Sequence, residues 1–415
     1  MLSDKKGSVP DNLISSLFSK DAKKTQGVAA NKISSIFIHA SKKTEVAGIK
    51  GAAKKILPVG IDIGTNFIKI VRLGQESKSA FEIEKIIIKE IPREAQDNAK
   101  QREQVLPALL KSIVEENNLW GDCFACLPHN LSKVNLITLP QMSQGEIDKA
   151  LRWEIRQSMQ TDLSEISLDY ILLENQRSIF QANQMGILTV TALKKESMQY
   201  LGLLKSAGLN ALALDVQALA NFATLEYTKT IQQDKLILFL DFGAGQATLS
   251  IINNGELIFI RPINVSGNSL TRAISEYCKV SWEEAESLKK NSGLSLLGQS
   301  PAAAGSPDKL MQVKNAILPL LENMVQDIER AAKYFFLQVL RLPAGHFDKL
   351  ILSGGASSMN SLAAFLNSRL GIETQVNDAF SKFVVTDHSY RDNPDQLGSA
   401  GVSLNAALGL ALRGL

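Results

Sequence analysis

The chain lacks a run of apolar residues long enough to cross a membrane. The longest apolar candidate, from Leu209 to Leu225, is interrupted by Asp215, Gln217 and Asn221, whereas a spanning helix needs about 20 predominantly apolar residues. The first residues also lack the order of basic, apolar and small residues that marks a signal peptide. We therefore expect a cytoplasmic protein.

Cysteine and histidine are also scarce. Three Cys in 415 residues exclude a disulfide framework. Cys123 and Cys126 form a C-x-x-C, but the run around them reads as a buried strand, in which residues three apart point to opposite faces. His129, His346 and His388 have no partner at ligand spacing. We expect no zinc or redox site, and interpret these Cys as small core residues.

Acidic residues are nearly absent from residues 1–57, which contain eleven Lys against four Asp and Glu. The net charge of the whole chain is only +3, so its positive charge belongs to this arm. The arm is also rich in Ser and Ala, and we expect it to be mostly disordered. No nucleic-acid partner is expected.

The arm contains a short repeat. Ile14-Ser15-Ser16-Leu17-Phe18, followed by two Lys, recurs nineteen residues later as Ile33-Ser34-Ser35-Ile36-Phe37, also followed by two Lys. Such an apolar triplet with trailing Lys can lie on an anionic membrane or in the groove of a partner. We hypothesise a peripheral membrane or partner contact through residues 13–43. A chance similarity within a low-complexity arm is the alternative.

A short Gly-containing turn occurs three times, each time directly after a β-rich run. The three segments are VGIDIGTN (Val59 to Asn66), LFLDFGAG (Leu238 to Gly245) and LILSGGAS (Leu350 to Ser357). Gly after a strand lets backbone N–H groups approach an anion. The turns thus predict a site for a phosphorylated ligand, although ordinary strand-ending turns would also contain Gly.

The spacing excludes the commoner phosphate loops. Neither G-x-x-x-x-G-K-[ST] nor a G-x-G-x-x-G that opens a helix after a strand is present. Asp62 and Asp241 instead end the first two strands, where each can hold a hydrated cation such as Mg²⁺, while Gly64 and Gly243 leave room for phosphates. Two equivalent turns about 180 residues apart indicate two halves that close over one ligand.

In this order the motifs resemble those of the actin-like ATPase superfamily. The resemblance implies ATP with Mg²⁺, and it extends to Glu283 to Lys289, which has the A-E-x-x-K spacing of an adenosine-binding helix. The implied phosphate-binding residues are Asp62, Gly64, Thr65, Asn66, Lys69, Gly243, Ala244 and Gly245. The implied adenosine-binding residues are Glu286, Lys289, Gly354, Gly355 and Ser357. The implied metal-binding residues are Asp62 and Asp241, through water.

The segment between the two phosphate turns identifies the branch of the superfamily. Leu139 to Ser143, Glu146 and Ala150 to Glu154 resemble the LPxMSxxExxxAxRWE stretch of the PilM family of type IV pilus assembly. The resemblance covers roughly Leu57 to Leu415. It implies an α/β, actin-like (ribonuclease H-like) two-domain ATPase fold with an FtsA-type 1C (SHS2-like) α+β insertion.

The resemblance and the periodicities together predict a domain organisation. Subdomain 1A would comprise 58–127 and 208–235, completed by 396–415, and the inserted subdomain 1C would comprise 128–207. Subdomain 2A would comprise 236–269 and 341–395, and subdomain 2B 270–340. The apolar segment from Ser399 to Leu412 predicts one C-terminal helix, which by resemblance crosses its counterpart around Ala218 to Thr224 at Gly401 and Gly409.

Two departures bear on catalysis. Ala247 stands where the superfamily usually has Thr, and Thr248 follows one residue later. No residue clearly supplies a base; Gln217 is the one candidate to position water, and Gln orients water better than it deprotonates it. We expect ATP binding with weak or negligible hydrolysis.

The resemblance implies a cytoplasmic scaffold, peripheral to the inner membrane. Under nucleotide control, a groove between 1A and 1C would bind the N-terminal peptide of a PilN-type inner-membrane protein, connecting the pilus platform to motor ATPases. A filament-forming FtsA-like cytoskeletal protein, and the equivalent subunit of a type II secretion or MSHA-type pilus system, are alternatives. A small-molecule kinase would need a polar substrate pocket and an Asp base near the cleft, and the sequence shows neither of them clearly.

Overall fold

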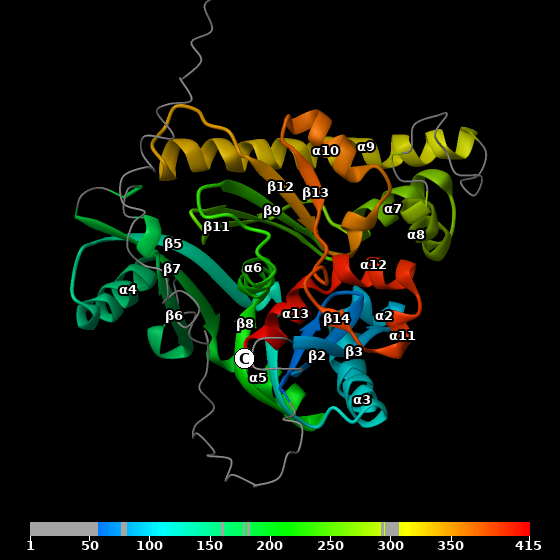
Figure 1. Cartoon of the computed structure of the whole chain (residues 1–415), viewed down its shortest axis with the longest axis horizontal. Helices are drawn as coiled ribbons and strands as arrows, with labels where there is room; N and C mark the ends of the chain where they lie inside the picture. Colours follow the sequence, from blue (N-terminus) through cyan, green and yellow to red (C-terminus); the bar gives the residue numbers. More distant parts are fainter. Residues whose placement is uncertain are drawn as a thin grey trace, which may run out of the picture.

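The computed structural model describes residues 57–75, 81–158, 162–176, 179–180, 183–291, 294 and 307–415. The arm hypothesis for residues 13–43 therefore falls outside the described part of the chain. Three β-sheets with flanking helices make up the described fold (Figure 1). Within the described residues, no helix is both long and apolar enough to span a bilayer.

The first sheet has six strands in the order β14-β3-β2-β1-β4-β8. Their bounds are β1 (Val59–Ile63), β2 (Phe67–Gln75), β3 (Phe81–Glu90), β4 (Gly121–Leu127), β8 (Leu209–Val216) and β14 (Val384–Val385). Every residue of β1 is buried, because α3 (Ala99–Asn117) and α13 (Asn405–Leu412) cover opposite faces of the sheet. A strand covered on both faces is apolar without alternation.

An inserted unit follows β4. It contains a three-stranded sheet in the order β5-β7-β6 and two helices. Their bounds are β5 (Ser132–Pro140), α4 (Gln144–Ser158), β6 (Ile166–Leu172), β7 (Gln184–Leu193) and α5 (Lys194–Ser206). Ile147, Leu151 and Ile155 form the buried stripe of α4 and are each at most 3% exposed, which follows from their helical spacing. Helix α5 packs on both α3 and β8 and so attaches the unit to the first sheet.

The second sheet has five strands in the order β11-β10-β9-β12-β13. Their bounds are β9 (Leu236–Phe242), β10 (Ala247–Asn253), β11 (Glu256–Ile263), β12 (Lys349–Ser353) and β13 (Thr374–Val376). The helices of this half are α7 (Gly267–Cys278), α8 (Trp282–Asn291), α9 (Pro307–Tyr334) and α10 (Leu362–Leu370). The long helix α9 lies across the far side of this half (Figure 1).

The expectation of one C-terminal helix is wrong. The segment forms α12 (Pro394–Ser403) and α13, which are separated at Leu404. Helix α13 crosses α6 (Gln217–Tyr227) as the resemblance implies, and a Cβ at Gly409 would overlap the carbonyl oxygen of Ala220. Gly401 lies elsewhere, beside Asp378 and Phe380.

The strand β14 bears on the subdomain limits. Val384 and Val385 pair with β3 of the first sheet, although the sequence assigns residues 341–395 to the second half. Ala379 and Phe380 also belong to the apolar cluster beside β2 and β3. We propose that the return to the first half begins near Ala379.

Candidate functional site

The two Asp-containing turns have the same local structure in both halves. Gly64 N–H donates to the Phe67 carbonyl oxygen at 2.9 Å, and Gly243 N–H donates to the Gln246 carbonyl oxygen at 3.0 Å. A Cβ at Gly243 would lie 2.8 Å from that second oxygen, a separation too short for any residue with a side chain to occupy without a shift. Each turn therefore reverses the chain tightly between two antiparallel strands.

Side chains opposite each carboxylate follow from the strand register. Asp62 pairs with Lys69 across β1 and β2, and Asp241 pairs with Thr248 across β9 and β10. Directly opposed residues of antiparallel strands project from the same face of the sheet. The displaced Thr248 therefore shares the face of Asp241, whereas Ala247 is fully buried.

The turns from the two halves meet. A Cβ at Gly245 would overlap the hydroxyl group of Thr65, so a larger residue there would have to displace the Thr65 side chain. Beside it, the amides of Asn66 and Asn268 donate to each other reciprocally, at 2.8 and 3.0 Å. Asn268 N–H also donates to the Ala244 carbonyl oxygen at 2.8 Å. The first residues of α7 are thus bonded to both turns.

Backbone donors at the turns remain available. In the described part of the chain, the N–H groups of Thr65, Asn66, Ala244 and Gly245 have no acceptor. Consecutive N–H groups of this kind form a concavity that binds anions. The two turns can therefore donate hydrogen bonds to phosphate oxygens from both halves.

The two carboxylates are buried, at 5% exposure for Asp62 and 6% for Asp241. Burial raises the pKa of Asp241, opposed by a hydrogen bond from Asn221 and by the charge of Lys69. Asp62 Oδ2 has no hydrogen-bond partner among the described residues, because Lys69 Nζ lies 3.6 Å away. A buried carboxylate oxygen without a donor is suited to a cation or to its water. These residues therefore fit Mg²⁺.

The third turn packs against the second. Gly354 has φ +89°, and a Cβ there would lie 2.5 Å from Asp241 Oδ1 and 2.6 Å from the Phe242 carbonyl oxygen. A Cβ at Gly355 would meet nothing within 4 Å, so this side of the turn is open. Ser357 donates its hydroxyl to the Ser353 carbonyl oxygen at 2.5 Å, and that hydroxyl supports the turn.

Glu286 and Lys289 form a connected pair on α8. Lys289 Nζ lies 2.6 Å from Glu286 Oε2 and donates to Thr271 Oγ1 at 2.8 Å and to the Gly267 carbonyl oxygen at 3.2 Å. Burial lowers the pKa of Lys289, and the charge of Glu286 opposes that shift. The ammonium therefore joins Glu286 of α8 to two residues of α7. Glu286 is the more accessible member, with 28% of its side chain exposed.

Gln217 begins α6, one turn before Asn221. Asn221 donates to Asp241 Oδ2 at 2.8 Å, and residues four apart lie on one face of a helix. Gln217 is therefore on the helix face nearest Asp241. Asp215, two residues earlier, is bound by Arg413 at 2.8 Å, which ties the end of β8 to the C-terminal residues.

Sequence reasoning missed Arg102. Its guanidinium group donates to the Gly64 carbonyl oxygen at 2.7 Å and to the Thr65 carbonyl oxygen at 3.0 Å. A rigid fork of donors suits two adjacent carbonyls. The only signal in the sequence was an Arg near the start of a helix, which is too common to select it.

A further missed feature connects the inserted unit to the second half. Gln176, which is fully buried, donates to the Asn253 carbonyl oxygen at 2.7 Å, and the Asn253 amide donates to Gln176 Oε1 at 2.7 Å. Beside them, Asn175 N–H donates to Glu256 at 3.1 Å, and burial raises the pKa of Glu256. We call these four residues the amide clasp.

The cysteines have the buried positions that the sequence predicts. Cys123 and Cys126 of β4 lie in different apolar clusters and are free. Burial raises the pKa of Cys123 to about 12 and that of Cys126 well above its usual range. Neither thiol is therefore poised to react. In the described residues, no group of three or more His, Cys, Asp or Glu could hold a metal ion, so a cation at the turns would depend on other ligands in addition to two carboxylates.

Comparison with known proteins identifies relatives. The family of type IV pilus assembly protein PilM matches residues 60–415. Cell division protein FtsA of Streptococcus pneumoniae is 26% identical over 175 residues, 39% of this chain and 34% of that protein. FtsA of Enterococcus faecalis is 26% identical over 183 residues, 41% of this chain and 39% of that protein. The chain thus spans little more than a third of these relatives. A solved PilM-PilN type IV pilus biogenesis complex is similar in fold, with a TM-score of 0.70 at 23% identity, covering 86% of this chain and 98% of that chain.

Proposed function

The chain belongs to the PilM family of type IV pilus assembly proteins and has the actin-like ATPase fold, and from this premise we propose that it is an ATP-binding scaffold. The nucleotide lies between the two phosphate turns and holds the halves together. The inserted unit, subdomain 1C, forms with subdomain 1A a groove for the N-terminal peptide of a PilN-type membrane protein. Nucleotide controls that groove.

One observation carries the nucleotide proposal: two equivalent turns, each after a buried Asp, meet across the two halves. The contact of Thr65 with Gly245 and the amide pair of Asn66 with Asn268 bring free N–H groups of both halves to one place. Phosphate oxygens bound there contact both halves at once. Such a ligand stabilises the closed arrangement by its differential affinity for it.

Each residue of the site would have its own role in nucleotide binding. Asp62 and Asp241 would hold Mg²⁺, which would supply positive charge to the phosphates. Lys69, with its Nζ 3.6 Å from Asp62, binds a phosphate oxygen. Glu286 binds the ribose, the open side of Gly355 receives the base, and Lys289 positions Glu286. Gln217 orients a water molecule without removing its proton, so hydrolysis is weak.

The inserted unit is attached to both halves, and this supports nucleotide control of the peptide groove. Helix α5 packs against α3 and β8 of the first half, and the amide clasp bonds the same unit to the hairpin of β10 and β11 in the second. Relative movement of the halves must then strain the clasp or move the unit. A nucleotide that fixes closure would therefore fix the groove.

Partner identity rests on the family and on the solved complex, whose name pairs a PilM with a PilN. A protein that binds a cytoplasmic peptide of an inner-membrane partner lies in the cytoplasm, peripheral to that membrane. We propose that it joins the pilus platform to motor ATPases in this position. Type II secretion and MSHA-type pilus platforms would present different peptides to the same groove.

The proposal is tested by titrating the purified protein with N-methylanthraniloyl ATP and Mg²⁺, with and without a synthetic PilN-type N-terminal peptide. Saturable binding should be lost in Asp241→Asn, retained in the exposed control Asp148→Asn, and tightened by the peptide, because coupling is reciprocal. Peptide binding unaffected by nucleotide would overturn nucleotide control alone. Absence of nucleotide binding would overturn the ATP proposal.

The second candidate that we propose is a filament-forming FtsA-like cytoskeletal protein, since two FtsA proteins match 39% and 41% of this chain. A filament would sediment in a concentration-dependent manner when ATP and Mg²⁺ are added. A scaffold that acts as a single copy would stay in the supernatant at every concentration.

A further inference from the structure

Four residues outside the phosphate turns form a second connection between the halves, which we call the outer bridge: Arg93, Asp97, Arg272 and Trp282. The guanidinium carbon of Arg93 lies 3.9 Å from the centroid of a Trp282 ring. Arg93 also pairs with Asp97 at 2.7 Å, and Asp97 lies 3.6 Å from Arg272. Asp97 therefore joins a cation of each half.

The outer bridge lies beside the proposed nucleotide site. Trp282, Glu286 and Lys289 are spaced at i, i+4 and i+7 on α8 and so share one face of the helix. Arg93 begins the short helix α2 (Arg93–Gln96), and just before it Ile91 N–H donates to the Asn66 carbonyl oxygen at 2.8 Å. Trp282 thus lies on the same helix as the proposed adenosine-binding residues, and Arg93 follows the residue that is bonded to the first phosphate turn.

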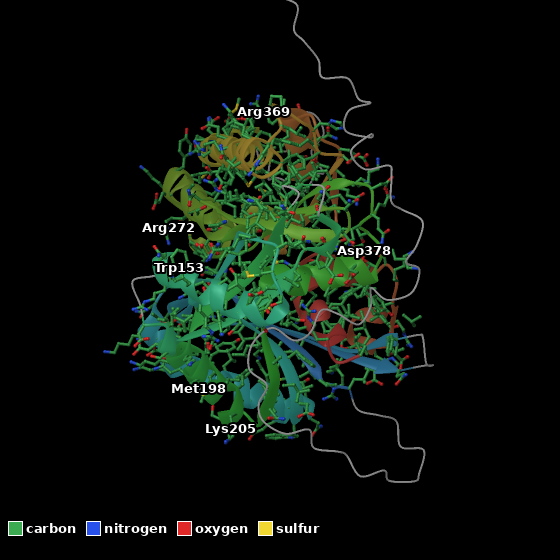
Figure 2. The ribbon with its side chains drawn as sticks, turned by 90° about the vertical axis from the view of Figure 1, so that its left-hand side faces the viewer. Trp153, Met198, Lys205, Arg272, Arg369 and Asp378 are labelled. Atoms are coloured by element: carbon green, nitrogen blue, oxygen red, sulfur yellow. The ribbon has the colours of Figure 1, made fainter. Side chains whose placement is uncertain are left out.

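The bridge is near the surface, whereas Asn268 is buried. Side-chain exposure is 37% for Arg93, 40% for Asp97 and 58% for Arg272, whereas Asn268 is 6% exposed. Figure 2 shows Arg272 at the side of the molecule, between Arg369 at one end and Met198 and Lys205 at the other. Asn268 of the asparagine pair therefore lies deeper than the outer bridge.

We propose that the outer bridge is a gate that sets the rate at which nucleotide enters and leaves. This inference rests on the proposed nucleotide site. When the bridge is formed, Arg93 covers the indole ring of Trp282, one helical turn before Glu286, which we propose binds the ribose. The halves then cannot separate on this side. Because exposed cation–π and ion pairs are weak, the bridge opens often enough for exchange and does not trap the ligand.

The geometry assigns a distinct part to each residue. Arg93 supplies a planar cation that stacks on an indole and pairs with a carboxylate at the same time, which a Lys cannot reproduce. Trp282 is the receiving surface. Asp97 and Arg272 add an ion pair, which salt should weaken because both side chains are exposed.

Stopped-flow release of N-methylanthraniloyl ATP in Mg²⁺ tests the gate. Arg93→Ala should release the probe about two- to five-fold faster than the native protein, the size expected for losing one exposed cation–π contact. Arg93→Lys should fall between the two. Adding Trp282→Leu to Arg93→Ala should cause little further change, because both remove the same contact. The control Arg152→Ala removes another exposed Arg that pairs with an Asp four residues away, here within α4, and should release at the native rate.

A nucleotide-free measurement separates this proposal from the one on which it rests. In protein carrying Trp120→Phe and Trp153→Phe, Trp282 is the remaining indole, and Arg93→Ala should shift its emission to longer wavelength as the ring gains water. If the native protein does not bind the probe, the ATP proposal and the gate both fall. If the probe binds and native and Arg93→Ala proteins release it equally fast, the gate alone is overturned; an unchanged Trp282 emission would refute the Arg93 stack itself.

Discussion

The crossing of α6 and α13 should not tolerate a single methyl group at Gly409. A Cβ there would lie 1.8 Å from the Ala220 carbonyl oxygen and 2.6 Å from its carbonyl carbon. Both are backbone atoms, so neither can move without moving α6. The substitution Gly409→Ala must therefore separate two helices that are packed between the sheets.

The change in the free energy of unfolding that Gly409→Ala causes is the sum of two opposing contributions. Overpacking a well-packed interior costs about 1–3 kcal/mol and occasionally more, and a rigid overlap of this size belongs at the upper end. Replacing Gly by Ala within a helix returns about 1 kcal/mol. Gly409→Ala should therefore lower the free energy of unfolding by about 2 kcal/mol.

A matched control exists in the neighbouring helix. Gly398 of α12 is exposed, and a Cβ there would meet nothing within 4 Å, so Gly398→Ala should gain about 0.5–1 kcal/mol from helix propensity alone. Urea denaturation, monitored by circular dichroism, would compare the stability of the two variants with that of the native protein. Equal midpoints for both variants would refute the inference that a close backbone approach at Gly409 holds the crossing together.

Three further outcomes are expected, each with its own measurement. Burial raises the pKa of Glu256, so the folded state holds this proton more tightly than the unfolded state and loses stability as the pH rises above that pKa. The urea midpoint of Glu256→Gln should therefore increase relative to that of the native protein as the pH rises from 4 to 7. A difference between the two midpoints that stays constant with pH would contradict this. Arg102→Met should weaken N-methylanthraniloyl ATP binding about tenfold, or ~1.4 kcal/mol, in an equilibrium titration, because two donors to the first turn are lost; unchanged affinity would exclude a positioning role. Gln176→Ala should lower the free energy of unfolding, measured by urea denaturation, by about 2–3 kcal/mol, because it leaves the buried Asn253 amide without an acceptor. If the two amides are coupled, the same substitution should lower it by less in protein that already carries Asn253→Ala.

The strands and turns around the site were predictable because their signals are local. Apolar runs followed by Gly identified β1, β2, β9 and β10, and Asp62 and Asp241 are the next-to-last residues of β1 and β9. The break between α12 and α13 was missed because an apolar composition continues through Leu404. The two-residue strand β14 was missed because its pairing with β3, about 300 residues away, leaves no local pattern.

The sequence therefore predicted the strand-ending turns that form the candidate site, but it did not predict which residues contact one another there. Gly, Asp and Lys at fixed spacing after apolar runs predict tight turns at the ends of strands, since backbone conformation and side-chain chemistry act within a few residues. The sequence also carried the family resemblance, which the match over residues 60–415 confirms.

Only the tertiary structure decided which groups meet. The reciprocal amides of Asn66 and Asn268 are 202 residues apart, the stack of Arg93 on Trp282 joins different halves, and the carbonyls that Arg102 binds lie about 37 residues away. Contacts of this kind depend on how whole sheets and helices pack, because a side chain finds its partner only after the two halves have come together.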